Sequence, residues 1–437
     1  MTDPTPPRRM YLNAFLMGVG HHEAAWRHPR SEPQRISEIG HYIELAQKAD
    51  RAGLDSVFFA DSLAIGPDFR RNMQFTFEPL TLLAALAVHT NRIGLIATAS
   101  TSYHHPYHLA RVFGSVDLIS HGRVGWNIVT SGGADEARNF GFDDPPTHSE
   151  RYSRADEFVE LVTKLWGSWQ PDALRLDVHT GDFVDGTKVS AINHSAQHFS
   201  VAGPLNVPRS PQGRPILVQA GSSPQGIDLA AKYADIIFTA QRSISDAQSF
   251  SDTVRSRVLH HGRPAQAVKI LPGIVPYIGA SEADARRLET ELTTLISADY
   301  GLRQLSNFIN TDVTGYSLDT PLRNIPPTSA IEGHKSRVDI IRKLAEDPDA
   351  TIGDILAAMG GGRGHRTIAG TPEQIADDLI TWFHSGAVDG FNIMPPLLPS
   401  GLDDFINHVL PILRRRGVFS GDYPAGTLRE NLHIPTP

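Results

Sequence analysis

The amino-acid sequence predicts an α/β protein with a (β/α)8 TIM-barrel fold. Three observations support this prediction: eight short apolar runs have the composition of buried strands, helical patterns separate them, and polar residues follow several of them directly. In such a barrel the carboxyl ends of the strands form one rim, which carries the active site. The polar residues after the strands are therefore considered together as one candidate site.

The predicted elements alternate along almost the whole chain. Strands are expected at residues 11–17, 56–60, 93–99, 123–129, 216–220, 235–239, 269–277 and 390–394. The clearest helical patterns fall at residues 38–51, 79–89, 107–119, 151–169 and 372–385. Thr371 and Gln374 form a capping box at the last of these helices, and Pro372 suits its first position. No internal repeat or dividing linker is visible, so residues 1–437 are expected to form one domain.

The fourth predicted strand leads into a loop of small residues. In the segment HGRVGWNIVTSGGADEARNFG, residues 121–141, the apolar run RVGWNIV is followed by TSGGA. The two glycines of this loop allow backbone amides to approach a ligand closely. A tight exit from the strand, without any ligand, would use the same residues.

Two longer segments, at 171–213 and 299–368, interrupt the alternation. The second contains helical patterns at 336–345 and 352–359 and then the run GGGRG, which suggests a hinge or a mobile connection. Insertions near the carboxyl ends of barrel strands are natural covers for an active site. We therefore expect both segments to lie near those strand ends and to form an active-site lid.

Composition excludes several classes of function. The chain has 437 residues, a net charge of -8 and no cysteine, so disulfides, thiolate catalysis and Cys-ligated metal centres are ruled out. The negative charge argues against nucleic-acid binding, and no apolar run reaches the roughly 20 residues that span a bilayer. The N-terminal segment has no secretory signal pattern, so we expect the mature protein to start there and to be cytoplasmic.

Twenty histidines suggest a metal site, but their spacing does not support one. Neither GHHEAAWRH nor HHPYH contains the HExxH pattern, and no HxH pair ends the first strand. We therefore expect no catalytic metal. A serine-hydrolase triad is not expected either, because no GxSxG motif is present.

Polar side chains are concentrated at the predicted rim. They follow or end the first five strands: His21, His22, Asp61, Thr98, Ser100, Asn127, Thr130, Ser131, Ser222 and Ser223. Local turn and capping interactions explain any single one of them equally well. Their shared position at one rim favours a common site.

Two helix starts at this rim are suited to a phosphate. Ser223 is a candidate cap for a helix that begins at Pro224, and Ser149 is a candidate cap with His148 before it and Tyr152 in the first turn. Free backbone amides and the helix dipole both favour an anion at such a position. Because GxGxxG and GxxxxGK[ST] motifs are absent, a Rossmann domain or a P-loop is not the binding module.

Taken in order, the motifs resemble those of one protein family. The segment GRVGWNIVTSGGADEARNFG occurs together with VFFAD, IGLIATASTSYHHPYHLARVF, HSERYSRADEF, SPQGRPILVQAGSS and GFNIMPPLLPSGLDDF. This combination is similar to the nitrilotriacetate monooxygenase component A, pristinamycin IIA synthase and dibenzothiophene-sulfone monooxygenase group of the bacterial-luciferase superfamily. The resemblance extends from about Tyr11 to the segment TLREN near the C-terminus.

The resemblance implies a luciferase-like barrel and a two-component, flavin-dependent monooxygenase. Such an enzyme receives reduced FMN (FMNH2) from a separate NAD(P)H:flavin reductase. It uses O2 to oxidise a small organic substrate at a C–N, C–S or C–H bond. The resemblance also implies a homodimer or a homotetramer.

The family's flavin site corresponds, residue by residue, to positions of this chain. These are Asp61, Thr98, His148, Tyr152 and Ser223, with Ser131 and Ser222 as additional phosphate donors. Phosphate contacts are expected from Tyr152 and Ser223, and Asp61 and Thr98 are expected nearer the ring system.

His21 and His334 are the predicted catalytic residues. They are expected to stabilise the flavin–oxygen adduct or to move a proton, because histidine titrates near neutral pH. A structural role is the alternative for both.

Two other functions remain open on the same fold, a noncatalytic flavin-binding protein and a deazaflavin-dependent oxidoreductase. The substrate is not indicated, because one fold serves many substrates. Candidate contacts to an anionic substrate are Arg70, Arg71, Arg323 and Arg363, although solvated surface arginines would show the same pattern.

Overall fold

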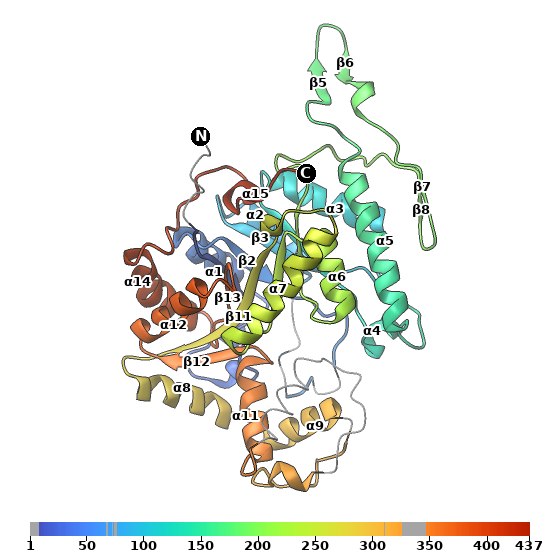
Figure 1. Cartoon of the computed structure of the whole chain (residues 1–437). Coiled ribbons are helices and arrows are strands. Elements are labelled where there is room, and N and C mark those ends of the chain that lie inside the picture. The colour runs from blue at the N-terminus through green and yellow to red at the C-terminus, as the bar shows by residue number, and fades with distance from the viewer. Residues whose placement is uncertain (1–7, 67–68, 72, 74–76, 310, 326–346) are drawn as a thin grey trace.

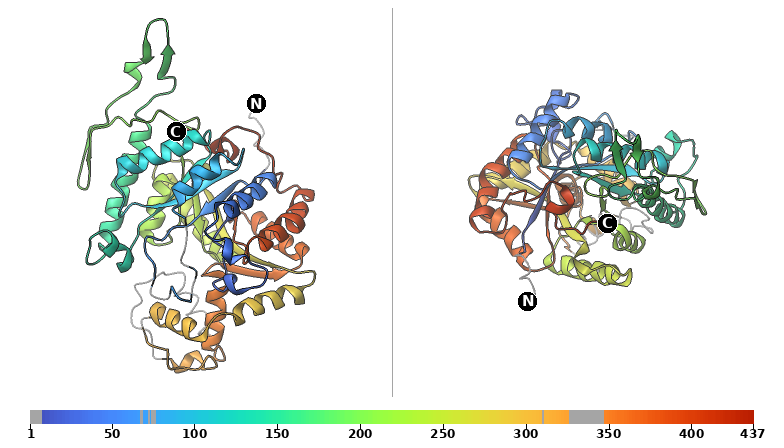
Figure 2. Two further views of the ribbon diagram at one scale, coloured as in Figure 1. Left: turned by 180° about the vertical axis from the view of Figure 1, so that it is seen from behind. Right: turned by 90° about the horizontal axis from the view of Figure 1, so that it is seen from above.

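Eight parallel strands form a closed barrel, as the sequence predicts. The computed structural model describes residues 8–66, 69–71, 73, 77–309, 311–325 and 347–437, and Figure 1 shows them in colour. The neighbours around the barrel are β1 (Tyr11–Phe15), β2 (Ser56–Phe59), β3 (Gly94–Ser100), β4 (Val124–Val129), β9 (Ile216–Gln219), β10 (Ile236–Thr239), β11 (Lys269–Ile278) and β13 (Gly390–Ile393). Pairing of β13 with β1 closes the ring, which Figure 2 shows from above.

Helices surround the barrel and connect successive strands (Figure 1). The five predicted helical patterns correspond to α1 (Ile39–Arg51), α2 (Pro79–Ala87), α3 (Pro106–Ile119), α5 (His148–Trp166) and α12 (Pro372–His384). Further helices around the barrel or at its two ends are α4 (Ala134–Asn139), α6 (Pro224–Tyr233), α7 (Ile244–His260), α8 (Glu282–Thr294), α13 (Ser400–Asp404), α14 (Leu410–Arg415) and α15 (Leu428–Asn431). The predicted Thr371–Gln374 capping box is present at α12.

Alternation along the strands produces two apolar layers. Side chains such as Phe15, Phe58 and Phe238 pack together in one cluster with residues of other barrel strands. Their neighbours along the strands, such as Leu12 and Val57, belong to a second cluster shared with the surrounding helices. Two-residue periodicity therefore assigns one face of each strand to the barrel interior and the other to the helices.

The first insertion differs from the expected position. It follows the last turn of α5 and contains the hairpins β5 (Leu174–Asp177) with β6 (Asp182–Val184) and β7 (His194–Ser195) with β8 (Ser200–Val201). A segment that runs from a helix into the next strand must lie at the amino ends of the strands. Figure 1 accordingly shows the β5–β6 hairpin on the side of the chain termini, away from α9 and α11, so this insertion is not a lid over the rim.

The second insertion lies at the carboxyl ends of the strands, as predicted (Figure 1). Its helices α9 (Ala298–Ile309) and α11 (Ile352–Gly362) share an apolar cluster of their own that includes Leu305, Ile309, Ile352 and Ile355. Residues 326–346, with the helical pattern at 336–345, lie outside the described residues. This insertion is therefore a small packed unit beside the rim.

The glycine-rich run is not the expected hinge. Gly360, Gly361 and Gly362 continue α11, and Arg363 ends this helix in the left-handed conformation with φ 48°. The chain then forms β12 (Arg366–Gly370), a ninth parallel strand that the sequence did not predict. β12 pairs with the second half of β11, from Ile274 onward, and thereby ties the insertion to the barrel.

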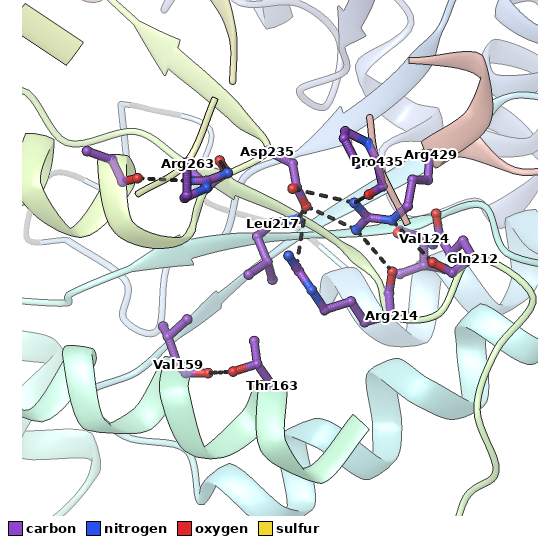
Figure 3. Close-up of polar contacts among 12 residues, drawn as sticks. Val124, Val159, Thr163, Gln212, Arg214, Leu217, Asp235, Arg263, Arg429 and Pro435 are labelled. Carbon is purple, nitrogen blue, oxygen red and sulfur yellow. Dashed lines mark hydrogen bonds and ion pairs between the residues drawn. The ribbon is translucent and has the colours of Figure 1, made fainter. Parts of the chain in front are cut away.

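A buried ionic cluster holds the C-terminal segment against the amino ends of the strands (Figure 3). Arg429 Nη2 donates to Asp235 Oδ2 at 3.1 Å, and the backbone N–H of Leu217 donates to the same oxygen at 2.9 Å. Arg214 forms a second ion pair with this carboxylate at 3.4 Å. Burial alone would raise the pKa of Asp235, but the two guanidinium groups hold it below its ordinary value.

In the part of the chain that the structure describes, helices fall short of the length and apolar character that crossing a bilayer requires.

Candidate active site

The structure brings most of the predicted site residues to the carboxyl rim of the barrel. Thr98 lies in β3 and Asn127 opposite it in β4, Asp61 follows β2, and Ser223 follows β9. His334 lies outside the described residues. The rim therefore has polar groups on several successive strands.

Thr98 and Asn127 form a buried polar pair across adjacent strands. Asn127 Nδ2 donates to Thr98 Oγ1 at 2.9 Å, and the two residues are register partners in β3 and β4. The amide oxygen of Asn127 is buried and accepts no hydrogen bond from any described residue. A buried acceptor without a donor is costly, so this oxygen is available to a ligand N–H or to water.

Tyr152 and Ser223 meet where the N-terminal part of α5 lies beside the start of α6. Ser223 caps α6 as predicted, since its Oγ accepts from the backbone N–H of Gly226 at 3.1 Å. The same hydroxyl donates to the phenol oxygen of Tyr152 at 3.4 Å. A Cβ atom on Gly226 would lie 3.0 Å from that phenol oxygen, and one on Gly221 would lie 3.3 Å from it. Both glycines therefore permit the close approach of Tyr152 to this turn.

The predicted cap of α5 was wrong by two residues. Thr147 is the N-cap and forms a capping box with Glu150, whereas Ser149 lies inside the helix and is exposed. Thr147 satisfies the THSE pattern of a capping box, which Ser149 does not. His148 is then the first helical residue, exposed, with its ring centroid 4.7 Å from that of Tyr152.

Three further predicted residues lie at the edge of this group. Ser222 is exposed immediately before the α6 cap, and Ser131 is half-buried after β4, with its carbonyl accepting from Ser102 Oγ at 3.1 Å. Asp61 is half-buried and accepts from the backbone N–H of Ser62 at 2.9 Å. Burial raises the pKa of Asp61 to about 6, and the nearby carboxylates of Glu78 and Glu136 act in the same direction.

His21 lies on the opposite side of the rim, after β1. Its ring centroid is 5.4 Å from that of Phe15 and 6.2 Å from that of His365, which in turn stacks on Phe238 at 4.8 Å. Its backbone N–H donates to the carbonyl of Pro395 at 2.9 Å. The preceding Gly20 has φ 142°, and a Cβ there would come within 2.3 Å of the Pro396 carbonyl oxygen. Only glycine allows this close passage of the chain.

His22 is a buried, neutral imidazole. Burial lowers its pKa to about 3, and the positive charge of Arg363 contributes in the same direction. Its Nδ1 accepts from the backbone N–H of Ala24 at 3.0 Å, so the proton of the neutral ring is on Nε2. Nε2 is buried and has no acceptor among the described residues. From the sequence, His22 is expected at the rim, but no pattern indicates a role for it.

Two residues of this rim carry more than the sequence indicates. The sequence offers Arg363 either as a contact to an anionic substrate or as a solvated arginine; in the structure its Nε donates to the carbonyl of His21 at 3.0 Å and its Nη2 is buried without a partner among the described residues. His365 was not considered, because no motif marks it and β12, which follows it, was not predicted. Both residues reach the rim because the end of α11 returns there.

The described residues contain no cluster of three or more histidine, aspartate or glutamate side chains that is arranged to hold a metal ion. Three kinds of group are therefore present at the rim. Hydrogen-bond donors for an anion lie at one side, buried amide and hydroxyl groups lie in the strands, and imidazoles lie at the other side.

Comparison with known proteins identifies relatives over the full length. The family model described as luciferase-like monooxygenase matches residues 18–390. N-acetyl-S-(2-succino)cysteine monooxygenase of Bacillus subtilis (strain 168) is 44% identical and covers 98% of both chains. Nitrilotriacetate monooxygenase component A of Aminobacter aminovorans is 41% identical, covering 98% of this chain and 97% of the relative.

Solved structures agree with these relatives. EDTA monooxygenase from Chelativorans sp. BNC1 superposes with a TM-score of 0.81 at 37% identity, covering 98% of this chain and 99% of that one. An F420-dependent secondary alcohol dehydrogenase has a TM-score of 0.59 at 15% identity over 92% of this chain and 98% of that one, which shows a shared fold alone.

Proposed function

This chain belongs to the luciferase-like monooxygenase family and is an oxidoreductase of that type, and we propose that its cofactor is reduced FMN supplied by a separate NAD(P)H:flavin reductase. The name of one relative, nitrilotriacetate monooxygenase component A, supports a two-component system. The observation that carries the cofactor proposal is the meeting of Tyr152, Ser223 and the start of α6 at the rim.

The residues at the rim suit the two ends of FMN. The first backbone amides of α6, the Ser223 hydroxyl and the Tyr152 phenol would bind the phosphate, with Ser131, His148 and Ser222 as further donors. The buried Thr98–Asn127 pair would face the ring system, since the unsatisfied Asn127 oxygen can accept from a ring N–H. Asp61, whose carboxyl is partly protonated near pH 6, would lie near the same ring.

The protein would contribute orientation, water exclusion and proton control. Bound FMNH2 would supply the electrons that activate O2, so that one oxygen atom is transferred to the substrate. Phe15 and Phe238, in the apolar wall beside His21, would keep water from the reacting atoms. His21 would hold or move a proton there, and neutral His22 would remain a hydrogen-bond donor through Nε2. His334, on the second insertion, is proposed as the other catalytic histidine.

We extend the proposal to assembly and location. The β5–β6 hairpin leaves Leu176, Val178 and Phe183 exposed by 59%, 87% and 66%, and a second copy of the chain would bury them in a homodimer or homotetramer. The enzyme would act in the cytoplasm, where NAD(P)H for the reductase is regenerated. The second insertion, next to the rim, would cover the bound substrate as a lid.

Anaerobic titration with FMNH2, followed by addition of O2 and candidate substrates in the presence of a flavin reductase, tests this function. We expect tight binding of FMNH2 and an oxygenated product that contains one atom from O2. Lack of FMNH2 binding would refute the proposal. A noncatalytic flavin-binding protein would instead bind FMN without turnover, and the deazaflavin alternative is not favoured, because the closely related chains are monooxygenases.

The relatives do not decide the substrate. Their names include carboxylic acids, such as nitrilotriacetate, and apolar compounds, such as dibenzothiophene sulfone.

A further inference from the structure

A cavity of about 200 Å³ beside the rim has an excess of positive charge. Its charged lining consists of Arg27, Arg70 and Arg71 against a single acid, Glu23. Leu295 and Ile296, which follow α8, provide an apolar wall. A cavity with three guanidinium groups and one carboxylate is suited to a small anion that has an apolar backbone.

Arg70 and Arg71 differ from most exposed arginines of this protein. Elsewhere on the surface, Arg30 pairs with Asp404 and Arg138 pairs with Asp135. Arg70 and Arg71 are adjacent and exposed, and neither forms a hydrogen bond or an ion pair with any residue that the structure describes. No ion pair within the described residues therefore offsets their mutual repulsion, and a bound anion would offset it.

A fourth arginine lines a pocket next to this cavity. Arg363 lines a neighbouring pocket that shares Glu23 and Ile296 with the arginine-lined cavity. The guanidinium is held in place, because its Nε donates to the His21 carbonyl at 3.0 Å. Its Nη2 is buried and unpartnered among the described residues. A buried guanidinium nitrogen without an acceptor is costly, so this group also calls for an anionic or carbonyl oxygen.

The cavity lies across the barrel from the proposed phosphate site. Arg27 follows β1 and Arg70 follows β2, whereas Tyr152 follows β4 and Ser223 follows β9. β1 and β9 are four positions apart in a ring of eight strands. FMN held by its phosphate at β9 would extend toward His21, so the cavity would remain for the substrate.

We propose that this cavity selects an anionic substrate that carries two or more carboxylates. Arg70 and Arg71 bind one carboxylate in the cavity, and Arg363 binds another next to His21. The carbon skeleton between them lies against Leu295 and Ile296. This assignment rests on the proposed monooxygenase function, because it places the substrate beside the flavin site.

Calorimetric titration with tricarballylate (propane-1,2,3-tricarboxylate) and with its uncharged trimethyl ester tests the proposal, in protein with and without FMN. We expect the acid to bind at least about tenfold more tightly than the ester, which has the same skeleton. Arg70→Gln with Arg71→Gln should weaken binding of the acid at least about tenfold, and Arg363→Gln should have a similar effect. The control Arg175→Gln removes an exposed arginine of the β5–β6 hairpin and should leave the affinity unchanged.

Two results would overturn the proposal: equal affinity for the acid and the ester, or unchanged affinity for the acid in the double variant. If the double variant kept its affinity for the acid but lost affinity for FMN, the arginines would be assigned to the cofactor phosphate. Because Arg70 and Arg71 are exposed, the double variant should fold. The binding test with the double variant therefore stays valid even if Arg363→Gln fails to fold. Failure to bind FMN would refute the proposed function while the titration without FMN still reports on the arginines.

Discussion

The phenol oxygen of Tyr152 lies 3.4 Å from the hydroxyl oxygen of Ser223, although the two residues are 71 positions apart in the sequence. Tyr152 is the fifth residue of α5, and Ser223 caps α6. The phenol of one helix therefore meets the N-terminal amides and the cap hydroxyl of the other at the rim. A dianionic phosphate is the group that this arrangement would stabilise.

Removal of the Tyr152 hydroxyl should weaken FMN binding. In Tyr152→Phe the lost hydrogen bond to a charged group is worth about 1.5 to 3 kcal/mol, so the Kd for FMNH2 should rise at least about tenfold. Anaerobic fluorescence titration measures the change, and riboflavin, which lacks the phosphate, should bind both proteins equally. Ser149→Ala, at an exposed position of the same helix start, is the control. An equal change for FMN and riboflavin would move the phosphate elsewhere.

A negative charge at the α6 cap should have a larger effect on FMN than on folding. Ser223→Asp retains a side chain that can accept from the Gly226 N–H, so the helix cap is kept. The carboxylate would repel the phosphate, so FMNH2 affinity should fall by more than in Tyr152→Phe. Urea unfolding should show a stability within about 0.5 kcal/mol of the wild type. Retained FMN affinity would contradict this phosphate position.

Substitution of His21 should lower turnover more than cofactor affinity. The imidazole lies beside Phe15 and His365, across the barrel from the proposed phosphate site, so His21→Gln leaves the phosphate donors in place. We expect kcat to fall about 100-fold, the low end of the range for a lost proton-transfer group, with a changed pH profile. His334→Ala should follow the same pattern. His384→Gln, exposed at the end of α12, is the control. A larger effect on FMN affinity than on kcat would assign His21 to the cofactor site.

Asp61 should make the apoprotein less stable as pH rises. Its pKa is about 6 in the folded protein, above the ordinary value of 3.8, because burial disfavours the carboxylate. The folded state therefore binds the proton more tightly, and this contribution is complete below about pH 4 and lost as pH rises through 6. Asp61→Asn should gain stability relative to the wild type over that interval in urea unfolding. Asp252→Asn, an exposed aspartate on α7, should show no such trend.

The exposed hairpin should control assembly. Leu176→Glu with Val178→Glu places charges on the β5–β6 hairpin, so light scattering should show a smaller oligomer than in the wild type. Leu259→Glu changes a similarly exposed apolar residue on α7 and should leave the mass unchanged. An unchanged mass in the hairpin variant would place the interface elsewhere.

The barrel was predictable because strand composition and alternation are local properties. All eight barrel strands occur where the apolar runs predicted them. β12 was missed because it lies outside the ring and its residues, Arg366–Gly370, are only partly buried, which gives a weak apolar pattern. The position of 171–213 was also wrong, although the order helix, insertion, strand determines that it lies at the amino ends.

The candidate site was predictable only where a motif marked it. Ser223 precedes Pro224 in a recognisable cap, and Thr98 and Asn127 end apolar strands. Arg363 and His365 reach the rim because α11 ends beside it, and no local sequence pattern indicates where a helix ends in space. The unpaired state of Arg70 and Arg71 depends on which carboxylates lie near them, so a sequence cannot show it.

The Asp235–Arg429 pair also constrains how this protein is made. Arg429 is synthesised 194 residues after Asp235, and all eight barrel strands precede it in the chain, so this carboxylate still lacks its most buried partner when the last strand has been made. The amino ends of the strands therefore remain incompletely covered until translation is nearly finished. A chain that ends before residue 429 would therefore have a barrel that is open at that end.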